Sequence, residues 1–401
     1  MLKQNTDLLH EFDNVFAFVM SKSTTVKKLE IVSLTDAVGR VLAEDLFSPT
    51  SVPAWRQSAM DGYGFSTTSP LTSLPINNVA YAGNAMESMS ENEAIHIMTG
   101  AVVPDHVDMI VPIEKALIQQ TDQGQHLLKP ADISFSRHIK AIGSDVAKNQ
   151  KVLSKGQLIR PQDQALLASV GVHQIPVYQR VSMVILTSGN ELVDPGASLD
   201  KGQIYDANTF LLTSLCKQLP VTILAQDLLM DDEANIKETL ARWQGQVDII
   251  ITVGGASVGQ KDFMQSCLVS WPESWRWKLN MKPGKPLSMA IMQQTTILAL
   301  PGNPLAAFMT FKTLASPFIQ KQAGITDWQN KPEKRVLASP IQTKGNRLEW
   351  CLVVETEQGL NPILNASSSH LLTLVQANGY IRVNSGQQYQ AGDLIDFWKI
   401  S

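Results

Sequence analysis

From Val181 onward, short hydrophobic runs alternate with segments in which hydrophobic residues recur at helical spacing. Three of these runs predict strands, at 181–186, 221–225 and 247–253. Helices are predicted between them, one that Asn208 caps and that runs to Leu219, and another that opens at Asp231. Because β-branched residues dominate the 247–253 run, we expect a central strand that is buried on both faces. The pattern therefore predicts an α/β unit with a parallel-rich sheet.

Hydrophobic and polar residues alternate strictly from Trp275 to Lys282. This alternation predicts a strand with three cations, Arg276, Lys278 and Lys282, on one face. A solvated outer face is the ordinary explanation for such cations. The strand ends, however, in a stiff Pro-Gly-Lys-Pro turn at 283–286, which adds a further cation. The basic face and the turn together favour an anion-binding strand end.

Two further strand ends suit an anion. Glycines follow the 247–253 strand, and a Pro-Gly-Asn-Pro turn links a predicted strand at 296–300 to a helix from 305 to about 322. Glycine lets backbone N–H groups approach a ligand, and the start of a helix offers free N–H donors. We therefore expect one phosphorylated or oxyanionic ligand at the carboxyl edge of the sheet. The residues predicted to bind it are Gly254, Gly255, Ser257, Gly259, Lys278, Lys282, Lys285, Pro286, Pro301, Gly302 and Asn303.

Three acids, Glu191, Asp231 and Asp262, also follow predicted strand ends. Each one alone is more typical of a helix cap or a turn. At one edge of one sheet, however, they could together ligate a divalent ion beside a phosphate. Asp61 lies in a turn between small residues, where an isolated carboxylate is usually a turn residue.

The remaining segments predict additional units around the α/β sheet. The first helix should bury its apolar stripe against a distant part of the chain. The mainly β segment reads as an insertion, and the C-terminal segment as a small β barrel or sandwich. The predicted elements are helices at 8–19, 34–46 and 164–170, the mainly β segment at 53–143 and the short strands of 335–400.

The composition excludes several classes of function. The 401 residues include 33 Lys and Arg and 37 Asp and Glu without a cluster of like charge, so a nucleic-acid partner is not expected. The 3 cysteines are scattered, which argues against disulfides or structural zinc and favours the reducing cytoplasm. No stretch is long enough to span a membrane, and the first residues do not resemble a secretion signal.

Six short motifs stand in order along nearly the whole chain. They are Ser58–Tyr63 (SAMDGY), Met98–Ala101 (MTGA), Thr187–Leu192 (TSGNEL), Gly254–Gly259 (GGASVG) with Asp262, Lys282–Pro286 (KPGKP) and Leu300–Pro304 (LPGNP). Together with the Gly39–Asp45 segment they resemble the MoeA family, the molybdopterin molybdenumtransferases, which includes the gephyrin E domain.

This resemblance implies an elongated chain of four domains. A central three-layer α/β molybdopterin-binding domain with a parallel-rich sheet is expected beside an elongated helical linker domain, an inserted mainly β domain and a C-terminal small β barrel. The expected boundaries are 1–47 with 147–179 for the linker, 48–146 for the insertion, 180–327 for the α/β domain and 328–401 for the barrel.

The resemblance also implies an activity, in which adenylylated molybdopterin is hydrolysed, AMP leaves and molybdate enters the dithiolene with support from Mg²⁺. The implied catalytic residues are Asp61, Thr99, Asp145, Glu191, Asp231 and Asp262, with Glu191, Asp231 and Asp262 as metal ligands. Family resemblance further implies a homodimer with an active site between subunits and transient contact with other cofactor-biosynthesis proteins.

Several positions depart from the family pattern. Relatives commonly carry Arg at Lys140, Glu at Ser144, Asp at Asn190, Ser at Ala306 and Arg near Cys351. The last two changes remove a hydroxyl and a guanidinium from the expected molybdate site, where Ser368, Ser369 and His370 could compensate. Two alternatives therefore remain open: a molybdopterin-binding scaffold or carrier, and the preceding adenylyl transfer from ATP.

Overall fold

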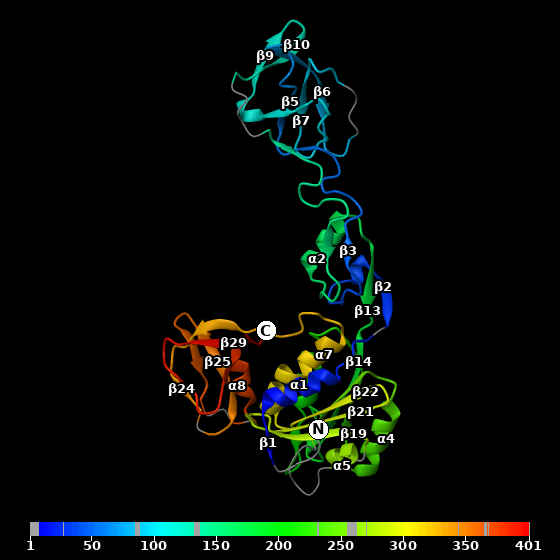
Figure 1. Ribbon diagram of the computed structural model, residues 1–401, viewed down its shortest axis with the longest axis vertical. Coiled ribbons are helices and arrows are strands. Elements are labelled where there is room, and N and C mark those ends of the chain that lie inside the picture. The colour runs from blue at the N-terminus through cyan, green and yellow to red at the C-terminus, as the bar shows by residue number, and fades with distance from the viewer. Residues whose placement is uncertain are drawn as a thin grey trace.

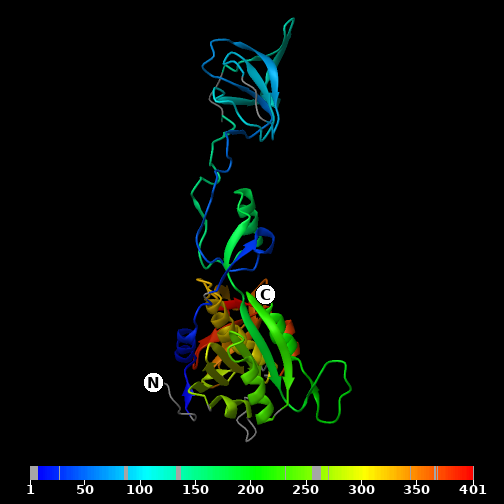
Figure 2. The ribbon, with the colours of Figure 1, turned by 90° about the vertical axis from the view of Figure 1, so that its right-hand side faces the viewer.

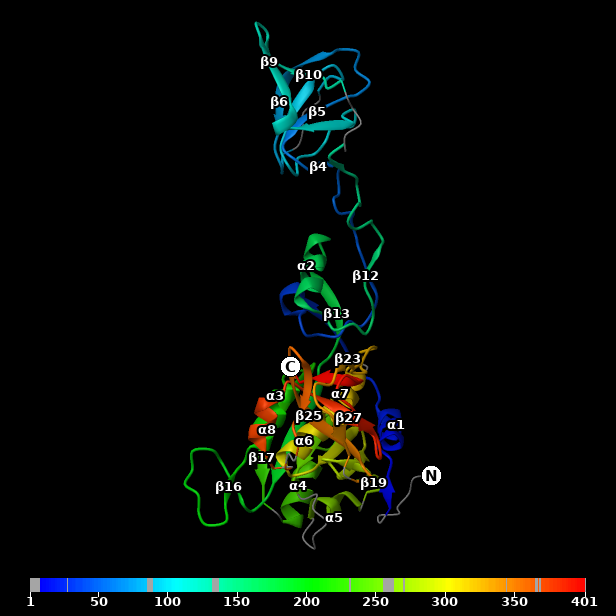
Figure 3. The ribbon, with the colours of Figure 1, turned by 90° about the vertical axis from the view of Figure 1, so that its left-hand side faces the viewer.

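The computed structural model describes residues 8–26, 28–84, 89–131, 137–230, 232–254, 263–269, 271–343, 345–364, 367 and 369–400. Figure 1 shows an elongated molecule, and the views in Figures 2 and 3 agree with it. A β unit lies at one end, a narrow middle unit contains α2 and β13, and an α/β unit and a second β unit form the other end. This arrangement confirms the predicted multidomain α/β plus β fold.

The α/β unit is built on a seven-stranded sheet of order β1-β19-β21-β22-β18-β14-β17. Its four parallel neighbours β17, β14, β18 and β22 confirm the predicted parallel-rich sheet. Since β21 is antiparallel to both β19 and β22, β19 points the same way as the parallel group. The strands are β1 Leu9–His10, β14 Val181–Ser188, β17 Val221–Leu229, β18 Ile249–Val253, β19 Glu273–Leu279, β21 Pro286–Met292 and β22 Thr295–Leu300.

Helices cover both faces of this sheet. Ile249 and Ile251 belong to the core on one face, and Ile250 belongs to the core on the other. The run of branched residues is therefore buried on both sides, as its sequence predicts. The helices of the unit are α3 Asn208–Cys216, α4 Glu233–Trp243, α5 Phe263–Val269, α6 Pro304–Thr310 and α7 Ser316–Gln322, with a π-helical segment at Phe311–Ala315 joining the last two.

The first predicted helix begins later than its periodicity indicates. Leu8 and Leu9 are 59% and 47% exposed, and β1 instead pairs with the end of β19. The helix α1 runs from Phe12 to Lys22 and buries Phe12 and Val15. Phe12 meets Trp350 of the C-terminal unit edge to face, with ring centroids 5.7 Å apart. As expected, the apolar stripe is covered by a distant segment.

The prediction of a helix at 34–46 is wrong. Only a 3-10 turn at Leu34–Asp36 forms, and Gly39 adopts a left-handed φ of 75° that a helix cannot continue. Val41 and Leu42 form isolated bridges with Leu158 and Val177. Their apolar side chains are therefore buried by pairing with distant extended segments, which competes successfully with a local helix.

The middle unit contains α2 and two small antiparallel ladders. The helix α2 spans Pro161–Ser169, which agrees with the helix predicted at 164–170. The ladders are β2 Leu29–Ser33 with β13 Gln174–Tyr178, and β3 Leu46–Phe47 with β12 Lys151–Leu153. The chain segments that precede and follow the distal β unit therefore pair with each other in the middle unit.

The two β units confirm the remaining predictions of fold class. The distal unit contains a six-stranded sheet of order β8-β5-β7-β6-β10-β9, and the C-terminal unit contains one of order β20-β25-β27-β29-β23 with β26 paired to β25. Within the described residues, each helix falls short of the length and apolarity that a membrane span requires. The distal strands are β4 Gln57–Ser58, β5 Gly62–Phe65, β6 Ser73–Ala80, β7 Ala94–Ile97, β8 Met109–Pro112, β9 Leu117–Thr121, β10 Gly124–Leu128 and β11 Ile139–Lys140. The C-terminal elements are β20 Met281–Lys282, β23 Glu333–Val336, β24 Ile341–Gln342, β25 Leu348–Thr356, β26 Gly359–Pro362, α8 Leu371–Gln376, β27 Gly379–Val383, β28 Gln388–Tyr389 and β29 Leu394–Lys399.

Candidate active site

The carboxyl edge of the seven-stranded sheet gathers most of the predicted ligand-binding residues that the structure describes. Glu191 follows β14, Gly254 follows β18, and the turn 301–303 follows β22. Lys278 lies near the end of β19, directly opposite Pro286 at the start of β21. Because β14, β18 and β22 are adjacent, their following turns form one continuous edge.

Glycine is required at one position of this edge, and a second glycine packs against it. A Cβ built on Gly254 would lie 2.1 Å from the carbonyl oxygen of Ser188, and its φ is 91°. A Cβ on Gly302 would lie 3.4 Å from the Cα of Gly254. The turns after three neighbouring strands therefore approach one another through their backbones, which leaves N–H groups close to the edge.

The cationic turn lies at the same edge, beyond β21 and β22. Trp277 and Leu279 are buried while Lys278 lies between them on the other face, so the predicted alternation is confirmed. Leu279 donates its backbone N–H to the carbonyl of Lys285 over 2.6 Å, which closes the turn. Lys282 and Lys285 are exposed, so the turn presents two ammonium groups to solvent.

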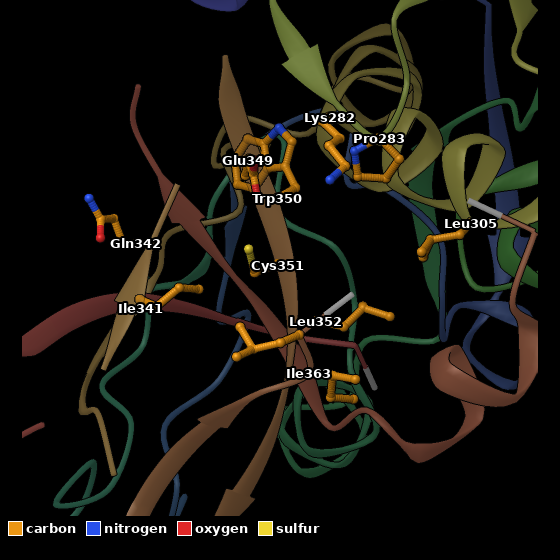
Figure 4. A pocket seen from close by; sticks show the side chains of 11 residues that line it. Lys282, Pro283, Leu305, Ile341, Gln342, Glu349, Trp350, Cys351, Leu352 and Ile363 are labelled. Atoms are coloured by element: carbon orange, nitrogen blue, oxygen red, sulfur yellow. The ribbon is translucent and has the colours of Figure 1, made fainter. Parts of the chain in front are cut away.

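A cavity of about 90 Å³ lies where this turn meets the C-terminal unit, as Figure 4 shows. Lys282, Pro283 and Leu305 line one side, and β25 supplies Glu349 and Cys351. Burial raises the pKa of the Cys351 thiol to about 12, and Glu349 adds to this effect while Lys282 opposes it. The thiol is therefore protonated near neutral pH and contributes no charge beside Lys282.

Asp61 and Thr99 form a hydrogen-bonded pair in the distal β unit. The Asp61 carboxylate accepts both the backbone N–H and the side-chain hydroxyl of Thr99, each over 2.7 Å. Gly62 pairs with Ile97 across β5 and β7, which brings the residues just outside the two strands together. The Thr99 N–H, followed by its hydroxyl, lowers the pKa of Asp61. Asp61 is therefore a carboxylate near neutral pH and suits a base or ligand better than an acid.

The structure does not bring this pair to the carboxyl edge within one chain. β5 and β7 lie at one end of the molecule, and β14 and β22 lie at the other (Figure 1). Asp145 belongs to the segment between β11 and β12, where its backbone N–H donates to the carbonyl of Val52 over 3.0 Å. Its carboxylate is exposed, as those of Asp61 and Glu191 are.

Part of the predicted metal and phosphate site falls outside the described residues. Asp231, Asp262, Gly255, Ser257 and Gly259 lie there, and so does Ser368, one of the residues that could compensate for lost oxyanion contacts. Within the described ranges, no three His, Cys, Asp or Glu side chains converge at a metal-binding distance.

The prediction that Asn208 caps α3 is wrong, since Asn208 is the first helical residue. Asp206 instead accepts the backbone N–H of Thr209 over 3.1 Å and the Thr209 hydroxyl. An acid three residues before the N–H that it accepts is the usual capping pattern, so the sequence did contain this signal. Asn208 turns inward and donates its side-chain N–H to the carbonyl of Gly302 over 2.6 Å. The pattern analysis missed this link between α3 and the turn after β22.

Comparison with known proteins places this geometry in a family. Three family models match in succession: the MoeA N-terminal region (domain I and II) at residues 10–171, a probable molybdopterin binding domain at 184–321, and the MoeA C-terminal region (domain IV) at 334–400. The fold and its carboxyl edge thus define a multidomain protein built around a domain of the molybdopterin-binding type.

The chain belongs to the MoeA family. It is 35% identical over 315 residues to a molybdopterin molybdenumtransferase of Haemophilus influenzae, covering 77% of each chain. It is 30% identical to molybdopterin molybdenumtransferase 2 of Mycobacterium tuberculosis, covering 90% of this chain and 94% of the relative. A solved MoeA structure from Pyrococcus horikoshii shares the fold with a TM-score of 0.81 at 24% identity, over 97% of this chain and 99% of that one.

Proposed function

We propose that this chain is a molybdenum insertase of cofactor biosynthesis, which hydrolyses adenylylated molybdopterin, releases AMP and places molybdate in the dithiolene. The observation that carries the proposal is the carboxyl edge, which combines close glycine turns with the cationic 282–286 turn in a chain of this family. A phosphorylated pterin and an oxyanion both need donors and positive charge at one place.

The described residues divide the chemistry between them. Backbone N–H groups around Gly254 and Gly302 hold the phosphate end of the substrate, while Lys278, Lys282 and Lys285 offset the charge of molybdate and of the departing AMP. Positive groups fixed in this way stabilise the charge that develops as the phosphoanhydride bond breaks. Pro286, Pro301 and Asn303 fix the two turns that carry these donors.

We further propose that the active site forms between two copies of the chain. Asp61 is held as a carboxylate by Thr99, yet it lies at the far end of the molecule from the lysines. An antiparallel pair of elongated subunits would bring the distal end of one chain to the carboxyl edge of the other. Asp145 would approach the same place, because it precedes the connection to the middle unit.

Glu191 fits the expected role as a ligand of Mg²⁺. Its carboxylate is exposed at the end of β14 and lies against Gly189, whose built Cβ would be 2.9 Å from one carboxylate oxygen. Exposed carboxylate oxygens are the ligands that this hard cation prefers. We assign Asp231 and Asp262 to the same ion because each follows a neighbouring strand. Bound there, Mg²⁺ would supply positive charge to the phosphoanhydride.

We propose four domains, with the linker at 1–47 and 147–179, the insertion at 48–146, the α/β domain at 180–327 and the barrel at 328–401. Most ladders fall within these bounds, but β1 joins the α/β sheet and β20 joins the C-terminal sheet. Because each of these two strands pairs with a sheet of a neighbouring domain, they support a firm connection between linker, α/β domain and barrel. Cys216, Cys267 and Cys351 are thiols that form no disulfide, which supports a cytoplasmic location.

The decisive experiment is to incubate the purified protein with adenylylated molybdopterin, Mg²⁺ and molybdate and to measure AMP. Molybdate-dependent AMP release supports the insertase. A carrier of molybdopterin is the second candidate, because the cavity beside Lys282 contains the neutral Cys351 thiol near the position where the family pattern has Arg. Tight pterin binding by folded protein without AMP release would favour the carrier, and consumption of ATP with molybdopterin would favour adenylyl transfer.

A further inference from the structure

The side-chain amide of Asn208 is buried at the carboxyl edge, and only one of its two polar atoms forms a hydrogen bond. The side chain is only 7% exposed, although it begins helix α3. Its Nδ2 donates to the carbonyl of Gly302 over 2.6 Å, whereas its Oδ1 is buried without a hydrogen-bond partner. Because the bond to Gly302 fixes the orientation of the amide, Oδ1 is held as an acceptor.

Ser188 provides a second unused group at the same place. Its residue is 3% exposed at the end of β14, and its Oγ is also buried without a partner. A chain of contacts connects the two residues, since Gly254 packs against Ser188 and Gly302 packs against Gly254. The hydroxyls of Thr187 and Thr209 are 2.6 Å apart and join the end of β14 to the start of α3. The two unused groups therefore belong to one rigid assembly.

Buried polar groups in proteins are nearly always hydrogen-bonded, because an unpaired one loses its solvation without compensation. Two such groups beside the turns of a proposed ligand site indicate that the ligand supplies the missing partners. The fixed Oδ1 of Asn208 requires a donor, which phosphate and molybdate lack near neutral pH. The other parts of the substrate do carry donors: the AMP half has the adenine amino group and the ribose hydroxyls, and the pterin has its exocyclic amino group. The pterin's amino group protrudes, whereas its ring N–H groups lie flush with the ring edge, and of these donors only the pterin's are kept when AMP leaves.

We infer that Asn208 is a specificity-determining residue whose Oδ1 accepts a hydrogen bond from the exocyclic amino group of the pterin. The inference rests on the proposed function. The amino group carries two hydrogens, and the Ser188 hydroxyl oxygen is the acceptor for the second. Asn208 thereby couples recognition of the ring to the Gly302 turn, which its Nδ2 holds in place.

The test compares pterin with lumazine, in which a carbonyl replaces the exocyclic amino group, as inhibitors of AMP release. In the wild-type enzyme pterin should inhibit about tenfold more strongly than lumazine, because the lumazine carbonyl would face the Asn208 acceptor. In Asn208→Leu, which has a similar volume and no acceptor, the ratio of the two inhibition constants should fall to about one.

Two variants separate recognition from a purely structural role. Thr213→Val removes another side-chain hydrogen bond of α3, a part-buried one from the Thr213 hydroxyl to Gln226 over 2.9 Å, and should leave the inhibition ratio unchanged. Asn208→Asp should regain the ratio as the pH falls, since a protonated carboxyl again offers one donor to Gly302 and one acceptor to the ring. Denaturant unfolding of each variant records the structural cost separately.

An inhibition ratio that Asn208→Leu leaves unchanged would overturn the inference, and so would an active enzyme that neither compound inhibits. Both results would leave the proposed function intact. If folded wild-type protein releases no AMP, the proposed function fails. Fluorescence titration with pterin and lumazine then decides the inference on its own, because a preference for pterin that Asn208→Leu abolishes would support it and equal binding would overturn it.

Discussion

The carboxyl edge of the α/β sheet and the Asp61–Thr99 pair are two functional regions built in different ways. At the edge, successive strands end side by side and their turns supply backbone donors, glycines and lysines. In the distal unit, a cross-strand pair brings together one carboxylate and the residue that donates two hydrogen bonds to it. The first region is suited to hold an anionic substrate, and the second is suited to keep one acid ionised.

The separation of the two regions is the reason for the proposed inter-subunit site. In that proposal neither region is a complete catalytic site, because the edge has the cations and the distal unit has the Asp61 carboxylate. A compact monomer could place them together, but here the narrow middle unit keeps them apart (Figure 1). In the proposed dimer, a second copy brings its distal end to the edge.

The strongest way to break this comparison is a complementation experiment. Asp61→Ala and Lys282→Ala should each lower kcat/KM by about 10²–10³, because each removes a fixed charge from the site. In a dimer that contains one copy of each variant, one of the two sites carries both substitutions and the other carries neither. Activity should then return to roughly one quarter of the wild-type value for random mixing.

Steady-state AMP release from co-expressed, separately tagged subunits measures this recovery. Dimers in which both subunits carry the same substitution are the control and should stay inactive. If the mixed dimers are as inactive as their parents, both residues act within one chain, and the inter-subunit site is excluded.

A pair of glycine substitutions sharpens the comparison through stability. Gly254→Ala places a methyl 2.1 Å from the Ser188 carbonyl and should cost about 3 kcal/mol or more, because backbone must move. Gly100→Ala, beside Thr99, meets only the Ala82 methyl at 3.5 Å and should cost about 1 kcal/mol for its left-handed φ of 81°. Denaturant unfolding followed by fluorescence compares the two variants, and equal losses would contradict the rigid packing of the edge.

The edge was largely predictable from sequence because its elements are local. Strand periodicity, the glycines after 247–253 and the alternation around Trp277 each depend on residues near one another in the chain. The same local information failed at 34–46, where bridges to Leu158 and Val177 override the helical pattern. It also misplaced the start of α1, because pairing with β19 recruits Leu9 and His10.

The distal pair and the Asn208 link were not predictable in this way. Asp61 and Thr99 are 38 residues apart, and only the pairing of β5 with β7 makes them neighbours. Asn208 and Gly302 are 94 residues apart and belong to turns that meet across the sheet edge. The family resemblance supplied Asp61 and Thr99 as expectations, whereas their hydrogen bonds required the three-dimensional structure.

A smaller effect tests the state of Asp61. Thr99 lowers the pKa of Asp61, so the carboxylate persists to lower pH than an unassisted Asp would allow. Thr99→Val removes the hydroxyl donor and should raise this pKa, which moves the acid limb of the kcat/KM profile to higher pH. Activity above that limb should change less than activity below it.

Thr99→Ser is the matched control, because it keeps both donors and should keep the wild-type acid limb. The pH dependence of AMP release measures all three proteins. An acid limb that Thr99→Val leaves in place would show that the titrating group in catalysis is not Asp61.

The smallest expected effect concerns the cavity beside Lys282, where the neutral Cys351 thiol adds no charge. Cys351→Arg adds a cation and should tighten molybdate by about threefold to tenfold, because a guanidinium pairs well with an oxyanion. Cys351→Ala should change little, since the thiol with a pKa of about 12 is already uncharged. The KM for molybdate at fixed pterin substrate distinguishes them. Equal values for the two variants would show that molybdate binds away from this cavity. The carboxyl edge would then bind molybdate without help from the C-terminal unit.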